Sequence, residues 1–243
     1  MGERQGVPTS SALLHNLRLL NRKERFYLVN AALGGFEICE TFKEQLRRAL
    51  GESVSIDWSR CEFAAMDYHF DWLYAAIFAS SEAIDLNAVS EKGHHIPVQT
   101  WSRQGGLISA TQEDIDLLVA FRDNQDEEKT HLILIEAKGV GSWGTKQIRS
   151  KGMRVSNLLR ERDVCRKAGV ILYFLYASPA APTQASLDGI EDLPDIMKLA
   201  NKHVWIDVGT NLVKVTQCDI AGQPQQRGPH WKFERTPCRG GTR

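Results

Sequence analysis

Two acidic residues and a lysine lie within or directly after apolar segments that the sequence predicts to be strands. Asp116 interrupts the run 115–121, and Glu136 and Lys138 close the run that begins at His131. A charged side chain in an apolar layer is destabilising unless it is paired or binds a metal ion. We therefore expect these three side chains either to pair with one another or to form a working site.

The alternation of side chains along a strand determines which of these charges face each other. Period-two spacing puts Glu136 and Lys138 on one face, while Ala137 points away. If the two segments pair as a hairpin through the loop 122–130, Asp116 comes to lie beside Glu136. Neighbouring carboxylates repel each other, and a divalent cation with oxygen ligands relieves that repulsion, so Mg²⁺ is the natural candidate.

Such an ion would lower the pKa of a bound water and stabilise negative charge on a phosphodiester during in-line attack. Lys138 could then orient the water or neutralise the oxygens on phosphorus. The pattern therefore predicts hydrolysis of a nucleic-acid backbone. The competing interpretation is an ordinary salt bridge at the ends of two strands. A second acid-x-Lys sequence, Glu127–Lys129, lies in a charged loop where solvated charges need no functional explanation.

The elements that must position these residues follow from hydrophobic periodicity and from glycine and proline positions. Helices are predicted over 11–33, as two short helices with Asn21 as a cap between them, and over 42–50, 62–80, 143–167 and 189–201. The helix 62–80 would carry Asp67 and Asp71 on one face. Strands are predicted at 96–102, 106–109, 115–121, 132–137 and 169–176, followed by a closing strand pair at 203–208 and 212–217.

With these residues in this order, the chain resembles the PD-(D/E)xK nuclease superfamily over roughly residues 62–177. The resemblance implies an α/β fold with a restriction-endonuclease-like αβββαβ core, in which helices flank a mixed central sheet. An N-terminal helical annex, 1–58, would pack on a core at 59–220, and 221–243 would form a mobile C-terminal tail. Ile115 stands in place of the Pro in the superfamily's name, as in many members.

The resemblance also implies roles for individual residues. The ligands of a Mg²⁺ or Mn²⁺ ion would be Asp116, Glu136 and the backbone carbonyl of Ala137, and Lys138 would be the catalytic lysine. Members often add an acid from the first helix, which here would be Asp71 or Asp67. Many also have a glutamine at the start of the helix after the acidic strand, where Gln147 stands.

The predicted helix after the acidic strand is rich in positive charge. From 145 to 167 it holds eight basic residues against two acidic ones. On a chain without net charge, this is the strongest candidate for contact with phosphates, although a solvated face would have the same composition. The expected nucleic-acid contacts are Lys146, Arg149, Lys151 and Arg154. Gln147, Lys151 and Arg154 lie nearly on one stripe of this predicted helix.

Overall composition limits the alternatives. The 30 basic and 30 acidic residues cancel, so no overall field indicates a nucleic-acid or membrane partner. Five scattered cysteines without a CxxC pair argue against a disulfide framework or a structural zinc site and favour a reducing cytoplasm.

His94-His95 lacks a third metal ligand, and the glycine-rich segment 139–144 lacks the ending of a P-loop. The uncharged run 168–187 is too short and too broken by prolines to span a bilayer.

We therefore expect a metal-dependent nuclease that acts on DNA in preference to RNA, in defence or repair, without a membrane partner. A homodimer that cuts two strands is an open alternative. The competing function is a catalytically inactive module that keeps the same core and binds or assembles on nucleic acid. The complete acid-acid-lysine set favours the enzyme.

Overall fold

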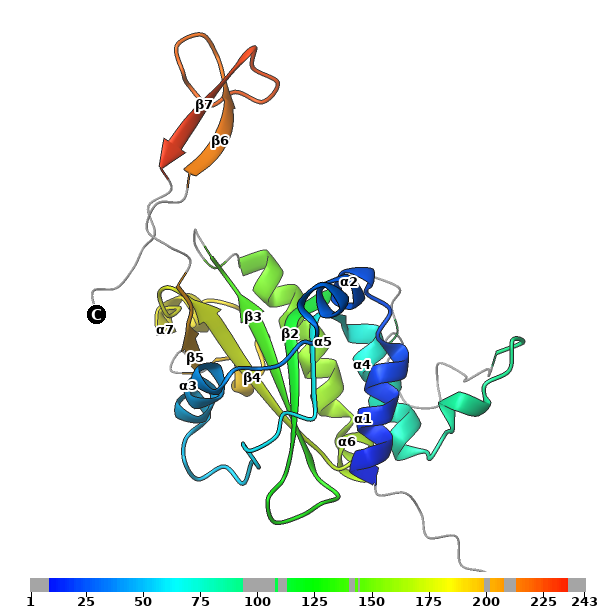
Figure 1. Cartoon of the computed structure of the whole chain (residues 1–243). Coiled ribbons are helices and arrows are strands. Elements are labelled where there is room, and N and C mark those ends of the chain that lie inside the picture. The colour runs from blue at the N-terminus through cyan, green and yellow to red at the C-terminus, as the bar shows by residue number, and fades with distance from the viewer. Residues whose placement is uncertain are drawn as a thin grey trace, which may run out of the picture.

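A mixed five-stranded sheet forms the centre of the molecule, in the order β1-β2-β3-β4-β5 (Figure 1). The computed structural model describes residues 9–93, 108, 113–139, 143, 145–198, 202–207 and 213–235. The first three strands are antiparallel neighbours, whereas β4 runs parallel to β3 and β5 parallel to β4. The strands are β1 (Phe63–His69), β2 (Asp114–Arg122), β3 (Thr130–Ala137), β4 (Val170–Ser178) and β5 (His203–Trp205). The predicted α/β class is confirmed.

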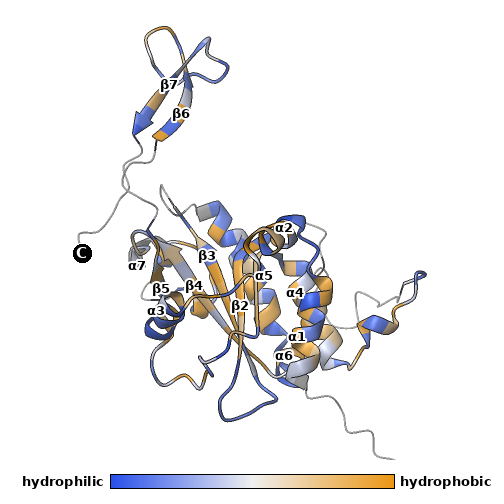
Figure 2. Cartoon of the chain, in the orientation of Figure 1, coloured by the Kyte–Doolittle hydropathy of each residue, from blue (hydrophilic) through white to orange (hydrophobic). Residues whose placement is uncertain are grey.

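Helices cover both faces of this sheet. The face with Leu118 and Leu134 packs against the apolar sides of four helices: α1 (Thr9–Leu20), α4 (Phe70–Ser81), α5 (Thr145–Arg160) and α6 (Arg162–Lys167). The opposite face, with Val119 and Ile133, packs against α3 (Glu40–Leu50). In Figure 2 the hydrophobic residues of the sheet lie between these helices. The N-terminal helices therefore contribute to the core on both sides of the sheet.

The remaining elements are short or lie outside the central sheet. They are α2 (Glu24–Leu33), α7 (Gln184–Asp188) and the 3-10 turns Leu86–Ala88 and Asp195–Met197. A second, two-stranded sheet pairs β6 (Val213–Cys218) with β7 (His230–Arg235) and stands apart from the five-stranded sheet in Figure 1. No helix within the described ranges is long and apolar enough to cross a membrane.

The β2–β3 hairpin is fixed at its loop end by a buried polar cluster around Asp123. The Asp123 carboxylate accepts backbone hydrogen bonds from Gln125 (2.8 Å) and Asp126 (3.0 Å), and its other oxygen lies 2.9 Å from His131 Nε2. His131 also lies 3.0 Å from the Tyr173 hydroxyl on β4. These contacts tie the loop to the sheet and so fix the register that continues to the other end of the hairpin.

The predicted helix over 62–80 is wrong in its first half. Residues 63–69 form strand β1, which pairs with β2 from Phe63 opposite Ala120 to His69 opposite Asp114. The helix begins only at Phe70, where the His69 side chain accepts a hydrogen bond from the Asp71 backbone (3.2 Å). Several apolar residues of this segment fit either periodicity, and pairing with β2 outweighs helix propensity.

Other boundaries also differ from the prediction. The helix expected over 143–167 divides at Glu161 into α5 and α6. The expected closing pair does not form, because β5 pairs with β4 and β6 pairs with β7, which lies in the segment expected to be a mobile tail. Of the helix expected over 189–201, the described residues contain a single 3-10 turn. The strands expected at 96–102 and 106–109, and His94-His95, lie outside the described residues, apart from Ile108.

Gly169 provides a test of the α6–β4 connection. Its φ is +64°, its carbonyl accepts a hydrogen bond from the Thr130 backbone (2.7 Å), and an added Cβ would lie 2.0 Å from the Glu128 carbonyl oxygen. We predict that Gly169→Ala lowers the free energy of unfolding by about 3 kcal/mol or more, because backbone strain and a clash act together. Urea unfolding measures this loss.

Gly34→Ala is the matched control. Gly34 also has a positive φ, +74°, but nothing lies within 4 Å of an added Cβ. Its substitution should therefore cost only the left-handed conformation, about 1–2 kcal/mol. Equal losses in the two variants would contradict the close packing at Gly169.

Candidate active site

The two acids meet where the β2–β3 ladder ends. The last paired residues are Leu117 and Ile135, so Asp116 and Glu136 are the next residues along the two strands. The backbone N–H of Ala137 donates to the Asp116 carboxylate (2.7 Å). Asp116 therefore uses its side chain to hold the end of β3, and the two carboxylates are fixed beside each other as the sequence predicts.

Helix α5 supplies the groups that hold Glu136. Gln147 Nε2 donates to one Glu136 carboxylate oxygen (2.8 Å), and the Lys151 ammonium donates to the other. Lys151 also lies 3.8 Å from Asp116, so one cation serves two carboxylates. Glu136 is only 2% exposed and Lys151 6%. The site is thus a cluster of two acids and one cation, in which Glu136 and Lys151 are buried and Asp116 is partly exposed.

The protonation of Glu136 reflects this arrangement. Burial raises its pKa to about 7, the Lys151 ammonium opposes the rise, and the negative charge of Asp116 adds to it. Near neutral pH, Glu136 is therefore divided between its protonated and ionised forms. A further cation beside the two acids would favour the ionised form, which is the behaviour expected of a carboxylate that can take a metal ion.

A second buried ion pair lies next to this cluster on α5. Arg154 pairs with Asp71 of α4, and both residues are 7% exposed. The Arg154 guanidinium lies 5.0 Å from the ring centroid of Tyr74, whose hydroxyl donates to the Arg154 backbone carbonyl. Asp71, suggested as an additional metal ligand, is therefore engaged by Arg154. Asp67 is on β1, not on the same helix as Asp71, and pairs with Arg25 at 3.1 Å.

The remaining predicted residues occupy different environments. Lys138 follows β3, its backbone N–H donates to Ala177 (2.7 Å), and its side chain is half-buried. No carboxylate in the described part of the chain forms an ion pair with it. Lys146 and Arg149 are exposed on α5, and Arg149 forms an ion pair with Glu191 at 3.3 Å. Of the four predicted nucleic-acid contacts, only these two side chains are open to solvent.

Lys151 and Arg154 face inward, toward the acids, whereas Gln147 is exposed and reaches Glu136 with its side-chain amide. Sequence reasoning placed these residues on one stripe but expected Lys151 and Arg154 to contact phosphates. A signal for their burial was present, because Lys151 is three residues after Ile148 and four before Val155, both of which are core residues. A lysine at an apolar position of a helix requires a buried partner, and here that partner is Glu136.

Within the described ranges, no group of three or more His, Cys, Asp or Glu side chains is arranged to hold a metal ion. Protein ligands at this position would be the two carboxylates and the carbonyl of Ala137. Comparisons with protein-family models, with characterised proteins and with solved structures found no match. Inferences about function therefore rest on the geometry of the site.

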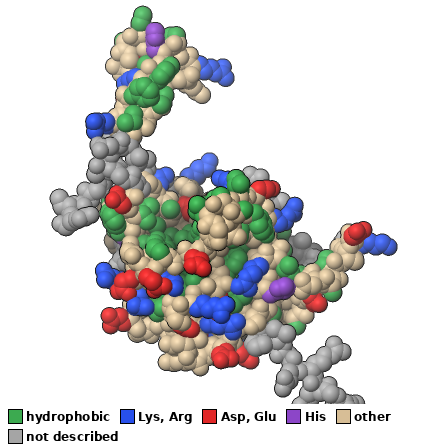
Figure 3. Space-filling view, in the orientation of Figure 1, with side chains coloured by type: hydrophobic (Ala, Val, Ile, Leu, Met, Phe, Trp, Pro, Cys, Tyr) green, Lys and Arg blue, Asp and Glu red, His purple; other side chains and the backbone are tan. Residues whose placement is uncertain are grey.

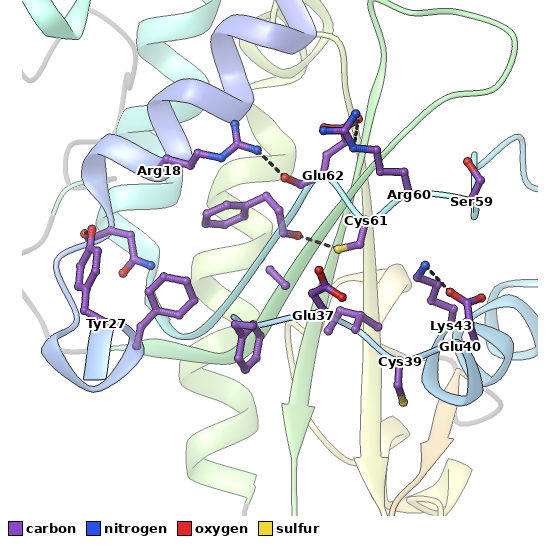
Figure 4. A pocket seen from close by; sticks show the side chains of 16 residues that line it. Arg18, Tyr27, Glu37, Cys39, Glu40, Lys43, Ser59, Arg60, Cys61 and Glu62 are labelled. Carbon is purple, nitrogen blue, oxygen red and sulfur yellow. Dashed lines mark hydrogen bonds and ion pairs between the residues drawn. The ribbon is translucent and has the colours of Figure 1, made fainter. Parts of the chain in front are cut away.

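A separate pocket of about 880 Å³ opens between the N-terminal helices and the start of β1 (Figure 4). Several of its polar groups are engaged with one another or with the backbone. Arg18 donates to the Glu62 carbonyl (2.5 Å), and Lys43 pairs with Glu40 (2.7 Å). Burial raises the pKa of Cys61 to about 11, so its thiol stays protonated and is a poor nucleophile. The pocket therefore offers no evident chemistry.

Removal of Lys151 tests the charge balance of the site. We predict that Lys151→Met lowers the free energy of unfolding by about 3–5 kcal/mol, because Glu136 and Asp116 then lack their shared cation. The double variant Lys151→Met/Glu136→Gln should regain most of this loss, because it also removes the uncompensated charge. Urea unfolding in the presence of EDTA measures both effects. Lys146→Met, a substitution of an exposed lysine on the same helix, is the control. A double variant no more stable than Lys151→Met would contradict the pairing.

Proposed function

We propose that the chain is a metal-dependent nuclease of the PD-(D/E)xK type that hydrolyses phosphodiester bonds, with DNA the favoured substrate. The observation that carries the proposal is the pair of strand-end carboxylates, Asp116 and Glu136, held side by side with an amide and an ammonium group from the following helix. The fold gives partial support. The antiparallel strands β2 and β3, a helical crossover and the parallel strand β4 follow one another as the resemblance implies. Helix α4, however, lies between β1 and β2, where the resemblance implies successive strands.

The residues present fit a hard divalent cation. Two carboxylates and a backbone carbonyl form an all-oxygen ligand set, and Mg²⁺ commonly binds one or two carboxylates while keeping several waters. Burial raises the pKa of Glu136, and the negative charge of Asp116 adds to this rise, so a second cation beside the two acids would stabilise the ionised carboxylate. When bound, such an ion supplies a Lewis acid that polarises the phosphodiester and lowers the pKa of a coordinated water.

The two lysines near the acids have different roles in this proposal. Lys151 contacts both carboxylates and is buried, so it balances their charge and positions them. Lys138 is half-buried and directly follows the strand that carries Glu136. If the alternation of the strand continues to it, Lys138 lies on the same face as Glu136. Lys138 is therefore the residue available to orient a water or neutralise phosphate oxygens. Gln147 keeps Glu136 in place by donating to its carboxylate.

The four basic residues of α5 that were predicted to contact nucleic acid also divide into two groups. Lys146 and Arg149 lie on the exposed side of α5, in its first two turns, next to Gln147. We assign these two side chains to phosphate contact, whereas Lys151 and Arg154 act inside the protein. The alternative function, a binding module without turnover, shares these surface contacts but does not need the metal.

Metal binding is the first test of this proposal. We predict that Mg²⁺ or Mn²⁺ raises the Tm of the wild-type protein, because ligand binding to the folded state stabilises it. Asp116→Asn and Glu136→Gln should each abolish the shift by removing one of the two carboxylates. Asp67→Asn should retain it, since Asp67 pairs with Arg25 outside the site. Retention of the full shift in both site variants would refute the assigned ligands.

Cleavage is the second test. With Mg²⁺ or Mn²⁺, the wild-type protein should cleave single- or double-stranded DNA, and Glu136→Gln and Lys138→Ala should each lower kcat by about 100-fold or more. Lys138→Ala should leave the metal-induced Tm shift intact, which separates a role in the chemistry from a role in metal binding. Lys146→Ala/Arg149→Ala should mainly raise KM and weaken its salt dependence. DNA binding without metal-stimulated cleavage would favour the inactive module.

A further inference from the structure

The β6–β7 hairpin has one apolar face that the rest of the described chain leaves open. Because Val215 pairs with Phe233 and Gln217 with Trp231, these side chains share a face of the two-stranded sheet. Val215, Trp231 and Phe233 are each between 62% and 66% exposed. Exposure of this kind on a two-stranded sheet, which is only marginally stable alone, indicates a binding surface.

The opposite face of the hairpin is charged and internally paired. Lys214 and Lys232 both pair with Glu234, at 3.0 Å and 2.8 Å. These two hydrogen bonds hold the pKa of Glu234 at about 2, so the carboxylate stays ionised and the trio keeps one net positive charge. This face stabilises the hairpin through cross-strand pairs. The apolar face is therefore the one available to a partner.

Charge indicates what kind of partner fits. Between 213 and 235 the hairpin has four basic residues and two acidic ones, a net charge of +2 on a chain whose total is zero. Arg235 follows Trp231 and Phe233 on the same face, so a cation borders the two aromatic rings. Figure 3 shows hydrophobic side chains next to Lys and Arg on the hairpin. Exposed aromatic rings next to cations are typical of surfaces that bind single-stranded nucleic acid.

The two rings are arranged so that bases can reach them. Trp231 and Phe233 are two residues apart on β7, about 6.7 Å along the strand. Their planes meet at 89° with centroids 5.0 Å apart, so they do not stack on each other. An edge-to-face pair covers a face of only one ring, and the high exposure of both side chains leaves other faces open to bases.

We propose that the β6–β7 hairpin is a binding arm for single-stranded DNA, with Trp231 and Phe233 stacking on bases and Arg235 contacting the backbone. The choice of DNA rests on the proposed nuclease function. The arm would hold an unpaired strand while the strand-end carboxylates act on the phosphodiester. A base stacked within a duplex cannot meet these rings, so the arm should prefer single strands.

Binding is tested with the full-length chain in EDTA, where no metal-dependent cleavage occurs, on a fluorescein-labelled mixed-sequence 15-mer and on a duplex of the same length. We expect tighter binding to the single strand. Trp231→Ala and Phe233→Ala should each weaken that binding by roughly tenfold, which is about 1.4 kcal/mol and within the range for base–aromatic stacking. Trp231→Phe should restore most of the affinity.

Val213→Thr is the matched control, because it keeps a β-branched shape on the same face while removing apolar surface. It should leave DNA affinity unchanged. An equal loss in Val213→Thr and Trp231→Ala, or tighter binding to the duplex, would overturn the proposal. So would a wild-type dimer in sedimentation that Trp231→Ala converts to a monomer without loss of DNA affinity, because the face would then bind a second copy. Single-strand binding without cleavage would retain the arm and refute only the nuclease.

Discussion

The repulsion between two carboxylates at neighbouring strand ends is the constraint on which the rest of the site depends. Asp116 and Glu136 are brought together by the β2–β3 register, which the polar cluster around Asp123 fixes at the opposite end of the hairpin. Their proximity is tolerable only if positive charge is available. Helix α5 provides this positive charge with Lys151. The charge balance of the site therefore depends on the crossover from β3 to β4, which places α5 beside the two acids.

This constraint also explains why α5 turns two basic side chains, Lys151 and Arg154, toward the inside. An amphipathic helix would normally turn Gln147, Lys151 and Arg154 toward solvent. Here each of the three finds a buried acid, Glu136 or Asp71, and apolar residues occupy the positions between them. Two buried ion pairs in succession fix the rotation of α5 against the sheet and against α4. Such buried ion pairs contribute little net stability. Their main effect is to select the correct packing of α5 against the sheet and α4.

Much of the central site could be predicted from sequence, because strand periodicity is a strong local signal. Alternation placed Asp116 and Glu136 on a shared face, and the loop 122–130 implied the hairpin that joins them. The segment 62–80 was mispredicted as one helix, because its first residues form a strand only through pairing with β2, which local sequence cannot reveal. The inward orientation of Lys151 was equally difficult to predict from local sequence, because it depends on a partner in another element.

The neutral total charge of the chain takes on a different meaning once the charges are assigned to positions. Lys151 and Arg154 are neutralised internally by Glu136 and Asp71, so they contribute little to the outer field. On α5, Lys146 and Arg149 lie on the exposed side, where a polyanion could contact them. Since screening limits the reach of such charges to about 10 Å at moderate salt, local placement decides recognition, and a total of zero is compatible with an acidic partner.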